Sequence, residues 1–270
     1  MSNVVITGAK GLVGSAFVRV HPDAVALTHR DLDITDAARV EETVRSLRPE
    51  VILNCAVIGV DECEADPALA ERVNVSGPAH LAASAERSGA TLVHFSSNYV
   101  FDGERADGLP YTEDDEPRPV NVYGETKLRG ERAVLDASPR ALVVRTSWVF
   151  GPGKASFLST VAARLARGER VQAITDTFAS ATFVDDLTAR VLELLARGRG
   201  GIHHVVNDGV CSYETFAREA ARLTGVHDET LIECTSEASM GRKARRPRWT
   251  PMRCVPPLRS WQDALAEYVR

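Results

Sequence analysis

The sequence has little lysine, few aromatic residues and no long hydrophobic run. Only four of its 32 basic residues are lysine, and acidic residues outnumber basic ones, which gives a formal net charge of −5. A dedicated nucleic-acid-binding protein normally carries a basic excess, so we expect no nucleic-acid partner. No uninterrupted apolar run approaches the roughly 18 residues of a membrane span, so we also expect no membrane association.

The five cysteines are widely spaced and include no Cys-x-x-Cys pair. This spacing predicts reduced thiols rather than a zinc site or a disulfide framework. The histidines likewise show no spacing with a carboxylate or thiol that is typical of a catalytic metal, so no metal is expected. Because the N-terminal residues contain no basic region followed by a cleavage site, we expect a cytoplasmic protein that is not exported.

Short β-branched runs alternate with longer amphipathic stretches over the first two-thirds of the chain. The predicted strands are Val4–Thr7, Ala24–Leu27, Val51–Asn54, Thr91–Phe95 and Leu142–Thr146. The predicted helices between them include Gly11–Val20, Asp36–Leu47, Asp66–Ser88 and Val122–Leu135. Strict alternation implies right-handed crossovers, and therefore an α/β fold with a doubly wound parallel sheet.

After about Ser147 the order loosens into helices separated by short strands and proline-rich connections. We therefore predict a dinucleotide-binding domain of residues 1–147 with parts of 170–205, and a smaller C-terminal α/β lobe of residues 148–169 and 206–270. The connection from Asn98 to Pro119 is too long for a plain turn. Connections of this length are usually functional or disordered.

A glycine-rich loop follows the first predicted strand and opens the first predicted helix. It contains Gly8, Gly11 and Gly14 at three-residue intervals. Such glycines allow a tight turn and close approach to a pyrophosphate, and the helix N-terminus offers free N–H groups. An ordinary glycine-rich turn is the alternative, but the strand-loop-helix context favours dinucleotide binding in a Rossmann-type sheet.

The end of the second predicted strand bears on cofactor choice. A carboxylate at this place usually selects NAD, whereas a guanidinium accommodates the 2′-phosphate of NADP. Arg30, together with Lys10 in the glycine loop, favours NADPH, while the adjacent Asp31 keeps NADH open.

Tyr123 and Lys127 lie four residues apart in a helical stretch and therefore share one face. A nearby ammonium stabilises a phenolate, so this spacing predicts a lowered Tyr123 pKa and a proton donor for carbonyl reduction. Ser96 and Ser97 come directly after the fourth predicted strand, and either hydroxyl could bind a substrate oxygen. Serines after a strand are also ordinary turn residues.

In chain order, the glycine loop, the strand-end serine and the Tyr-x-x-x-Lys pair resemble the extended branch of the short-chain dehydrogenase/reductase superfamily. Further segments resemble the dTDP-4-dehydrorhamnose reductase family within it. The most specific of them are Tyr99-Val-Phe-Asp102-Gly103 and Arg145-Thr-Ser-Trp148-Val. The resemblance runs through most of residues 3–185 and weakly to the terminal helix.

The resemblance implies that Ser97, Tyr123 and Lys127 are catalytic and that Trp148 lines the sugar site. Glycines of the first loop would hold the pyrophosphate, Asp33 and Ile34 would flank the adenine, and Asn54 would lie beneath the nicotinamide ribose. With the residues argued above, the predicted cofactor set is Gly8, Lys10, Gly11, Leu12, Gly14, Arg30, Asp33, Ile34, Asn54, Cys55, Ala56, Tyr123 and Lys127. The predicted substrate set is Asn98, Tyr99, Trp148 and Ile58.

Three departures from the family pattern bear on the substrate. Ser97 replaces a Thr and keeps the hydroxyl, whereas Asn98 replaces an Asp and removes a charge beside the reacting sugar. Ile58 and Gly59 stand where the family has Tyr and Thr. Substrate choice depends on paired polar groups in the pocket, so these changes affect the substrate more than the reaction.

The sequence therefore predicts NAD(P)H-dependent reduction of the 4-keto group of a nucleotide-activated deoxysugar. One alternative is a reductase of a different carbonyl substrate in a specialised-metabolite pathway, and another is a non-catalytic regulatory subunit that keeps the cofactor site. The resemblance also suggests a homodimer. The basic run from Arg242 to Arg248 is interpreted as a solvated surface or as a partner of the substrate diphosphate.

Overall fold

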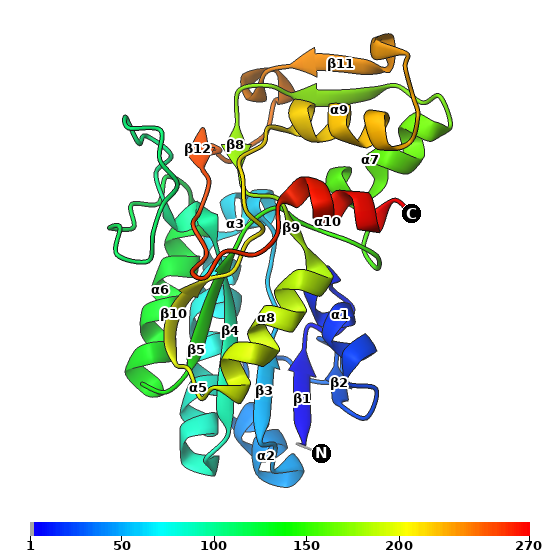
Figure 1. Cartoon of the computed structure of the whole chain (residues 1–270). Helices are drawn as coiled ribbons and strands as arrows, with labels where there is room; N and C mark the ends of the chain where they lie inside the picture. The colour runs from blue at the N-terminus through cyan, green and yellow to red at the C-terminus, as the bar shows by residue number, and fades with distance from the viewer. Residues whose placement is uncertain (1–2) are drawn as a thin grey trace.

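The computed structural model describes residues 3–270 and is built on a six-stranded parallel sheet with strand order β10-β5-β4-β3-β1-β2. The bounds are β1 (Val4–Thr7), β2 (Val25–Leu27), β3 (Val51–Asn54), β4 (Thr91–Ser97), β5 (Leu142–Thr146) and β10 (Gly201–His204). The chain reverses its direction of sheet growth between β1 and β3, which is where ligands bind in open α/β sheets. The predicted α/β class with a parallel sheet is confirmed (Figure 1).

Helices cover both faces of this sheet. On one face lie α2 (Ala37–Leu47), α5 (Gly77–Ser88) and α6 (Val122–Ala137), and on the other lie α1 (Leu12–Val20) and α8 (Val184–Ala196). Successive strand residues point to opposite faces, so Ile52 packs with the first group and Leu53 with the second. This explains why the strands read as continuous apolar runs rather than alternating ones.

The predicted helix over residues 66–88 is interrupted by a π-helical turn. It consists of α4 (Pro67–Glu71), the π turn η1 (Arg72–Ser76) and α5, and it is preceded by α3 (Val60–Ala65). The Gly77 N–H donates to the Arg72 carbonyl five residues back, and Pro78 has no N–H to offer Asn74. The proline therefore removes one α-helical bond and favours the wider turn.

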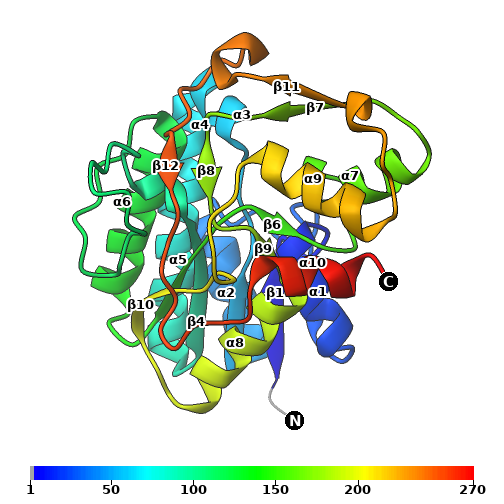
Figure 2. The same cartoon turned by 45° about the horizontal axis from the view of Figure 1, so that its top comes forward.

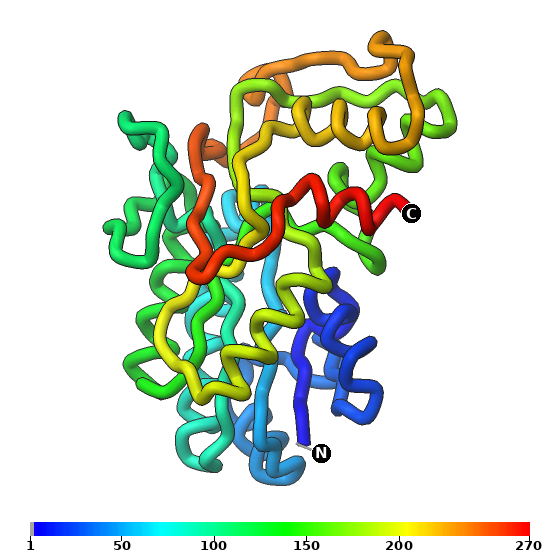
Figure 3. The backbone as a smooth tube through the Cα atoms, viewed as in Figure 1, coloured from blue at the N-terminus to red at the C-terminus, as the bar shows by residue number. Residues whose placement is uncertain are grey.

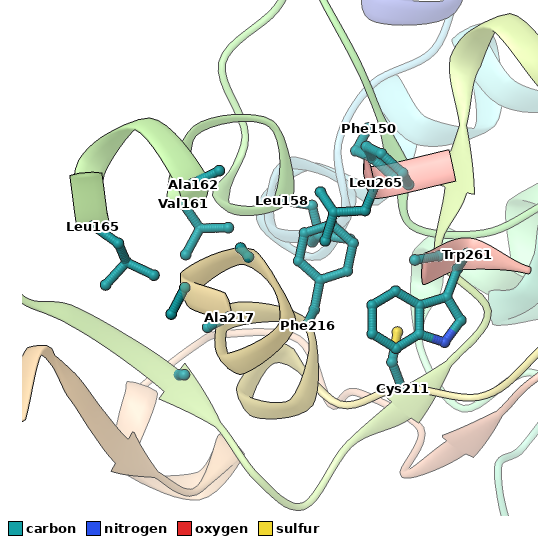
Figure 4. Packing of buried hydrophobic residues seen from close by; sticks show 14 of the residues in the cluster. Phe150, Leu158, Val161, Ala162, Leu165, Cys211, Phe216, Ala217, Trp261 and Leu265 are labelled. Atoms are coloured by element: carbon teal, nitrogen blue, oxygen red, sulfur yellow. The ribbon is translucent and has the colours of Figure 1, made fainter. Parts of the chain in front are cut away.

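A second hydrophobic core lies in the C-terminal lobe, which contains α7 (Phe157–Ala166), β7 (Val171–Ile174), α9 (Tyr213–Leu223), β11 (Ile232–Thr235) and α10 (Trp261–Tyr268). Figure 4 shows Phe216 and Trp261 facing each other there, with ring centroids 5.5 Å apart. The short elements are β6 (Val149–Phe150), β8 (Phe178–Ala179), β9 (Thr182–Phe183), β12 (Trp249–Thr250), η2 (Asn98–Val100), η3 (Glu229–Leu231) and η4 (Glu237–Met240). The domain boundary given above stays a prediction.

The C-terminal lobe lies over the carboxyl ends of the sheet strands, as Figures 1 and 2 show. After β12 the chain runs back beside β10 before it enters α10, a path that is easiest to follow in Figure 3. The connection over residues 98–119 meets this returning segment, since Tyr111 forms a β-bridge with Met252. Among residues 3–270, no helix combines the length and apolarity that crossing a membrane requires.

Candidate active site

The glycine loop connects β1 to α1 and contains a tight turn. Gly8 adopts φ +63°, and the Gly11 N–H donates to its carbonyl over 2.9 Å. A Cβ on Gly14 would lie 2.4 Å from the Gly8 carbonyl oxygen, so this glycine is required by packing of helix on loop. A Cβ on Gly11 would meet only that oxygen, at 3.2 Å, and would otherwise enter open space. Gly11 also provides no side-chain cap to α1, which leaves the first-turn N–H groups free for an anion.

The segment after β2 contains Asp31, which favours NADH, and Arg30, which favours NADPH. Asp31 accepts hydrogen bonds from the Thr28 backbone and hydroxyl, which lower the pKa of this carboxyl and tie it into a turn. Arg30 and Lys10 are exposed and do not line the nearby cavity, whereas Asp33 and Ile34 do.

Two cavities adjoin each other at the carboxyl ends of the strands. The first, called the glycine-loop cavity, measures about 350 Å³ and is lined among others by Gly8, Gly11, Asp33, Ile34 and Ile58. The second, called the tyrosine cavity, measures about 240 Å³ and is lined by Ser97, Asn98, Tyr123, Lys127 and Trp148 among others. Cys55, Ala56 and Val57 line both.

Most of the residues predicted to bind the cofactor or the substrate line one of these two cavities. Of the predicted cofactor residues, Lys10, Leu12, Gly14 and Arg30 line neither cavity. Ile58 was predicted to contact the substrate, but it lines the glycine-loop cavity rather than the tyrosine cavity.

The structure separates the roles of the two serines at the end of β4. The Ser96 hydroxyl donates to the buried carboxylate of Glu131 and is therefore already engaged. Ser97 is 8 % exposed, lines the tyrosine cavity and accepts a hydrogen bond from the Tyr99 N–H over 3.2 Å. Ser96 lines the same cavity, but its hydroxyl is held by Glu131, which favours Ser97 as the serine that meets a substrate.

Tyr123 lies in the first turn of α6, which Asn121 caps by accepting from the Gly124 N–H over 2.7 Å. Burial raises the pKa of Tyr123 to about 12, and its hydrogen bond with Ser97 offsets this only in part. The four-residue spacing of Tyr123 and Lys127 had predicted a lowered pKa for Tyr123. The prediction was wrong for the structure as it stands, because the Lys127 ammonium donates to the Phe95 carbonyl over 2.6 Å and desolvation dominates at Tyr123.

Lys127 itself is 1 % exposed. Burial lowers its pKa to about 8, while the Glu131 carboxylate acts in the opposite direction. His94 lies 3.5 Å from the Lys127 ammonium on one side and 3.1 Å from the Asn54 amide on the other. Burial holds the pKa of His94 well below its ordinary value, so the ring is neutral.

A buried ion pair lies one helical turn beyond Lys127. Arg145 donates to both carboxylate oxygens of Glu131, over 2.9 and 2.7 Å, and both side chains are at most 2 % exposed. Sequence reasoning missed Glu131 and His94 as parts of the site. A signal for the first was present, because Tyr123, Lys127 and Glu131 recur at intervals of four on one helix face.

Aromatic side chains lie beside the tyrosine cavity. Trp148 has φ +38°, a strained conformation for a bulky residue, and its ring lies 4.1 Å from that of Tyr213. The Tyr99 ring meets Tyr123 edge to face at 5.8 Å. Backbone strain at a cavity wall is typical of functional sites.

The basic run is only partly a solvated surface. Arg246 is 9 % exposed in its side chain and donates to both oxygens of Asp61, each over 2.7 Å. Arg242 pairs with Glu237 at 3.2 Å, whereas Lys243, Arg245 and Arg248 are exposed. Arg242, Arg245 and Arg246 therefore all have carboxylate partners within the chain.

Comparison with known proteins decides the family. The model of the RmlD substrate binding domain matches residues 1–270. The chain belongs to this family. Among RmlD-family relatives, a dTDP-4-dehydrorhamnose reductase of Mycobacterium tuberculosis is 40 % identical, covering 97 % of this chain and 91 % of that protein. The resemblance noted in the sequence is confirmed.

Solved structures of RmlD-family reductases share the fold. A dTDP-4-dehydrorhamnose reductase from Clostridium acetobutylicum is 33 % identical with a TM-score of 0.91, covering 99 % of this chain and 98 % of that one. One from Bacillus anthracis, solved in complex with NADP, is 29 % identical with a TM-score of 0.92 and the same coverages.

Proposed function

We propose that the chain reduces the 4-keto group of a nucleotide-activated deoxysugar with NADPH, dTDP-4-dehydrorhamnose being the first candidate substrate. The observation that carries this proposal is the pair of adjoining cavities, one at the glycine loop and one holding Ser97, Tyr123 and Lys127. The names of the RmlD-family relatives support the sugar, and the NADP complex of the Bacillus anthracis relative supports the cofactor.

The residues present fit a dinucleotide. Gly11 leaves open space above the loop, and the uncapped start of α1 offers N–H groups for the pyrophosphate. Asp33 and Ile34 would hold the adenosine half, and Asn54, Cys55 and Ala56 would support the other half. When bound, NADPH supplies the hydride for the sugar carbonyl. Arg30 is exposed and directly follows His29, which lines the glycine-loop cavity, so Arg30 would meet the 2′-phosphate.

The side chains of the tyrosine cavity can then complete the reduction. With its pKa near 12, Tyr123 carries its proton at neutral pH and can donate it to the alkoxide that forms. Ser97 would hydrogen-bond the same oxygen and stabilise the charge that develops on it. Lys127, charged below a pKa of about 8, supplies a positive charge at this end of the site. Trp148 and Asn98 would contact the sugar.

The test is oxidation of NADPH and NADH, followed by loss of absorbance, with a panel of nucleotide 4-keto-6-deoxysugars that includes dTDP-4-dehydrorhamnose. Turnover of that sugar with NADPH supports the proposal. Turnover of a different keto sugar alone would support the alternative of another carbonyl substrate, and Asn98→Asp then tests the altered position. Tight NADPH binding without any turnover would support a regulatory subunit. The homodimer stays a prediction, which light scattering of the purified protein checks.

A further inference from the structure

A row of three buried polar side chains crosses the sheet and ends at Lys127. Thr7 on β1, Asn54 on β3 and His94 on β4 are register partners in turn, so they project from the same face of these neighbouring strands (Figure 1). All three are at most 2 % exposed. Lys127 comes to the end of this row from α6, and its Nζ lies 3.5 Å from His94 Nε2.

The partners of Asn54 fix the direction of its side-chain amide. Asn54 Oδ1 accepts from the Thr7 hydroxyl over 2.8 Å and from the Ala56 N–H over 3.3 Å. A backbone N–H can only donate, so the side of the amide that faces Ala56 must be the oxygen. The amide nitrogen, which can only donate, therefore faces His94 Nδ1 over 3.1 Å.

This direction selects one tautomer of His94. The ring is neutral, since burial holds the pKa of His94 well below its ordinary value. A neutral imidazole has one N–H and one acceptor nitrogen, and the acceptor must be Nδ1 because it faces the Asn54 NH₂ group. The His94 proton is therefore on Nε2, facing Lys127. An ammonium has no acceptor for this N–H, whereas a neutral amine accepts it with its lone pair.

We propose that His94 is a positioning residue of the site: the row that begins at Thr7 directs its Nε2–H to Lys127 and so favours the amine form of Lys127 over the ammonium. Hydrogen bonding to the neutral form of a group disfavours its charged form. The consequence for the reduction, which is the pH at which Lys127 loses its charge, rests on the proposed function.

Other titratable groups also face Lys127. Burial lowers the pKa of Lys127, while the Glu131 carboxylate on α6 and the thiols of Cys63 on α3 and Cys55 after β3 act in the opposite direction. Tyr123, one helical turn earlier, has a pKa of about 12 and is uncharged at neutral pH. Since His94 acts against the ammonium, removal of its N–H should raise the pKa of Lys127.

The first test follows Lys127 itself. The chain has only four lysines and the other three are exposed, so NMR of protein isotope-labelled at lysine Cε resolves Lys127. His94→Leu is expected to raise the pKa of Lys127 by about one unit, because the facing N–H is lost while the burial stays. A fall would mean that His94 accepts from the ammonium, and no change would mean that burial alone acts; either result overturns the inference.

The matched control is His204→Leu, which makes the same substitution on β10. His204 is 2 % exposed, and its ring nitrogens have no hydrogen-bond partner among residues 3–270. The pKa of Lys127 is expected to stay the same in this variant. An equal rise in both variants would overturn the inference, because it would show a general effect of replacing a buried histidine.

The second test reads the tautomer of His94 in the wild-type protein by nitrogen NMR of the histidine side chains, and it needs no variant to fold. A proton on Nε2 is expected, and a proton on Nδ1 would overturn the inference.

In the activity assay, the fall of kcat/KM with rising pH should move up by about one pH unit in His94→Leu and stay in place in His204→Leu. An unmoved profile in His94→Leu would overturn the role of His94 in the reduction. Absence of turnover by the wild-type protein would overturn the proposed function, while the two NMR measurements still decide whether His94 acts on Lys127.

Discussion

Replacing Glu131 with Gln removes the carboxylate from the buried ion pair beneath the site while preserving its shape. Arg145 then keeps a full charge at 2 % exposure with no anion beside it. Breaking a buried pair by removing one partner costs about 3–5 kcal/mol. At roughly 2–4 °C per kcal/mol for a protein of this size, the Tm is expected to fall by about 6–20 °C.

The assay is thermal unfolding followed by circular dichroism, with urea titration as a second measure of the free energy of unfolding. The matched control is Glu125→Gln, which makes the same change on the exposed face of the same helix and is expected to shift stability by less than about 0.5 kcal/mol. A fall in Tm of less than about 2 °C for Glu131→Gln would show that the Glu131–Arg145 ion pair does not contribute the folding stability argued above.

Three further predictions concern the cofactor and the proton donor. Because burial lowers the Lys127 pKa to about 8 and raises the Tyr123 pKa to about 12, kcat/KM should fall as pH rises through about 8, where Lys127 loses its charge. A profile that stays flat to pH 10 would contradict the role of Lys127. Gly11→Ala should weaken NADPH binding about tenfold at nearly unchanged Tm, whereas Gly14→Ala should lower the Tm because its Cβ meets backbone at 2.4 Å; equal effects on both measures would refute this distinction. Arg30→Ala should raise the KM for NADPH about tenfold and leave that for NADH unchanged, and an equal change for both cofactors would exclude a 2′-phosphate contact.

Much of the fold was predictable because the strands are short apolar runs with clear boundaries. β1, β3 and β5 have the predicted bounds, and β4 runs two residues further than predicted, through Ser97. The π-helical turn at Arg72–Ser76 was not predicted, because the periodicity of apolar residues does not reveal a missing backbone hydrogen bond. Proline at position 78 was the local signal that could have located it.

The identity of the site residues was predictable where their spacing matches a known chemical motif. Properties that depend on burial in the folded chain were not predictable. The glycine loop and the residues Ser97, Tyr123 and Lys127 could be read from spacing along one element. The direction of the Tyr123 pKa could not, since it depends on how far the folded chain excludes water. Thr250 reaches Asn98 only through the return of the C-terminal segment, a contact that no local pattern indicates.

Turnover by Tyr123→Phe is the measurement that tests the central claim most directly. NADPH oxidation with dTDP-4-dehydrorhamnose is compared between the wild-type protein, Tyr123→Phe and the control Tyr268→Phe, whose hydroxyl bonds the Ser159 carbonyl in the C-terminal lobe. Loss of the proton donor should lower kcat by about 10²–10⁴-fold, with NADPH affinity within about threefold and the control unaffected. Turnover by Tyr123→Phe at the wild-type rate would contradict the account.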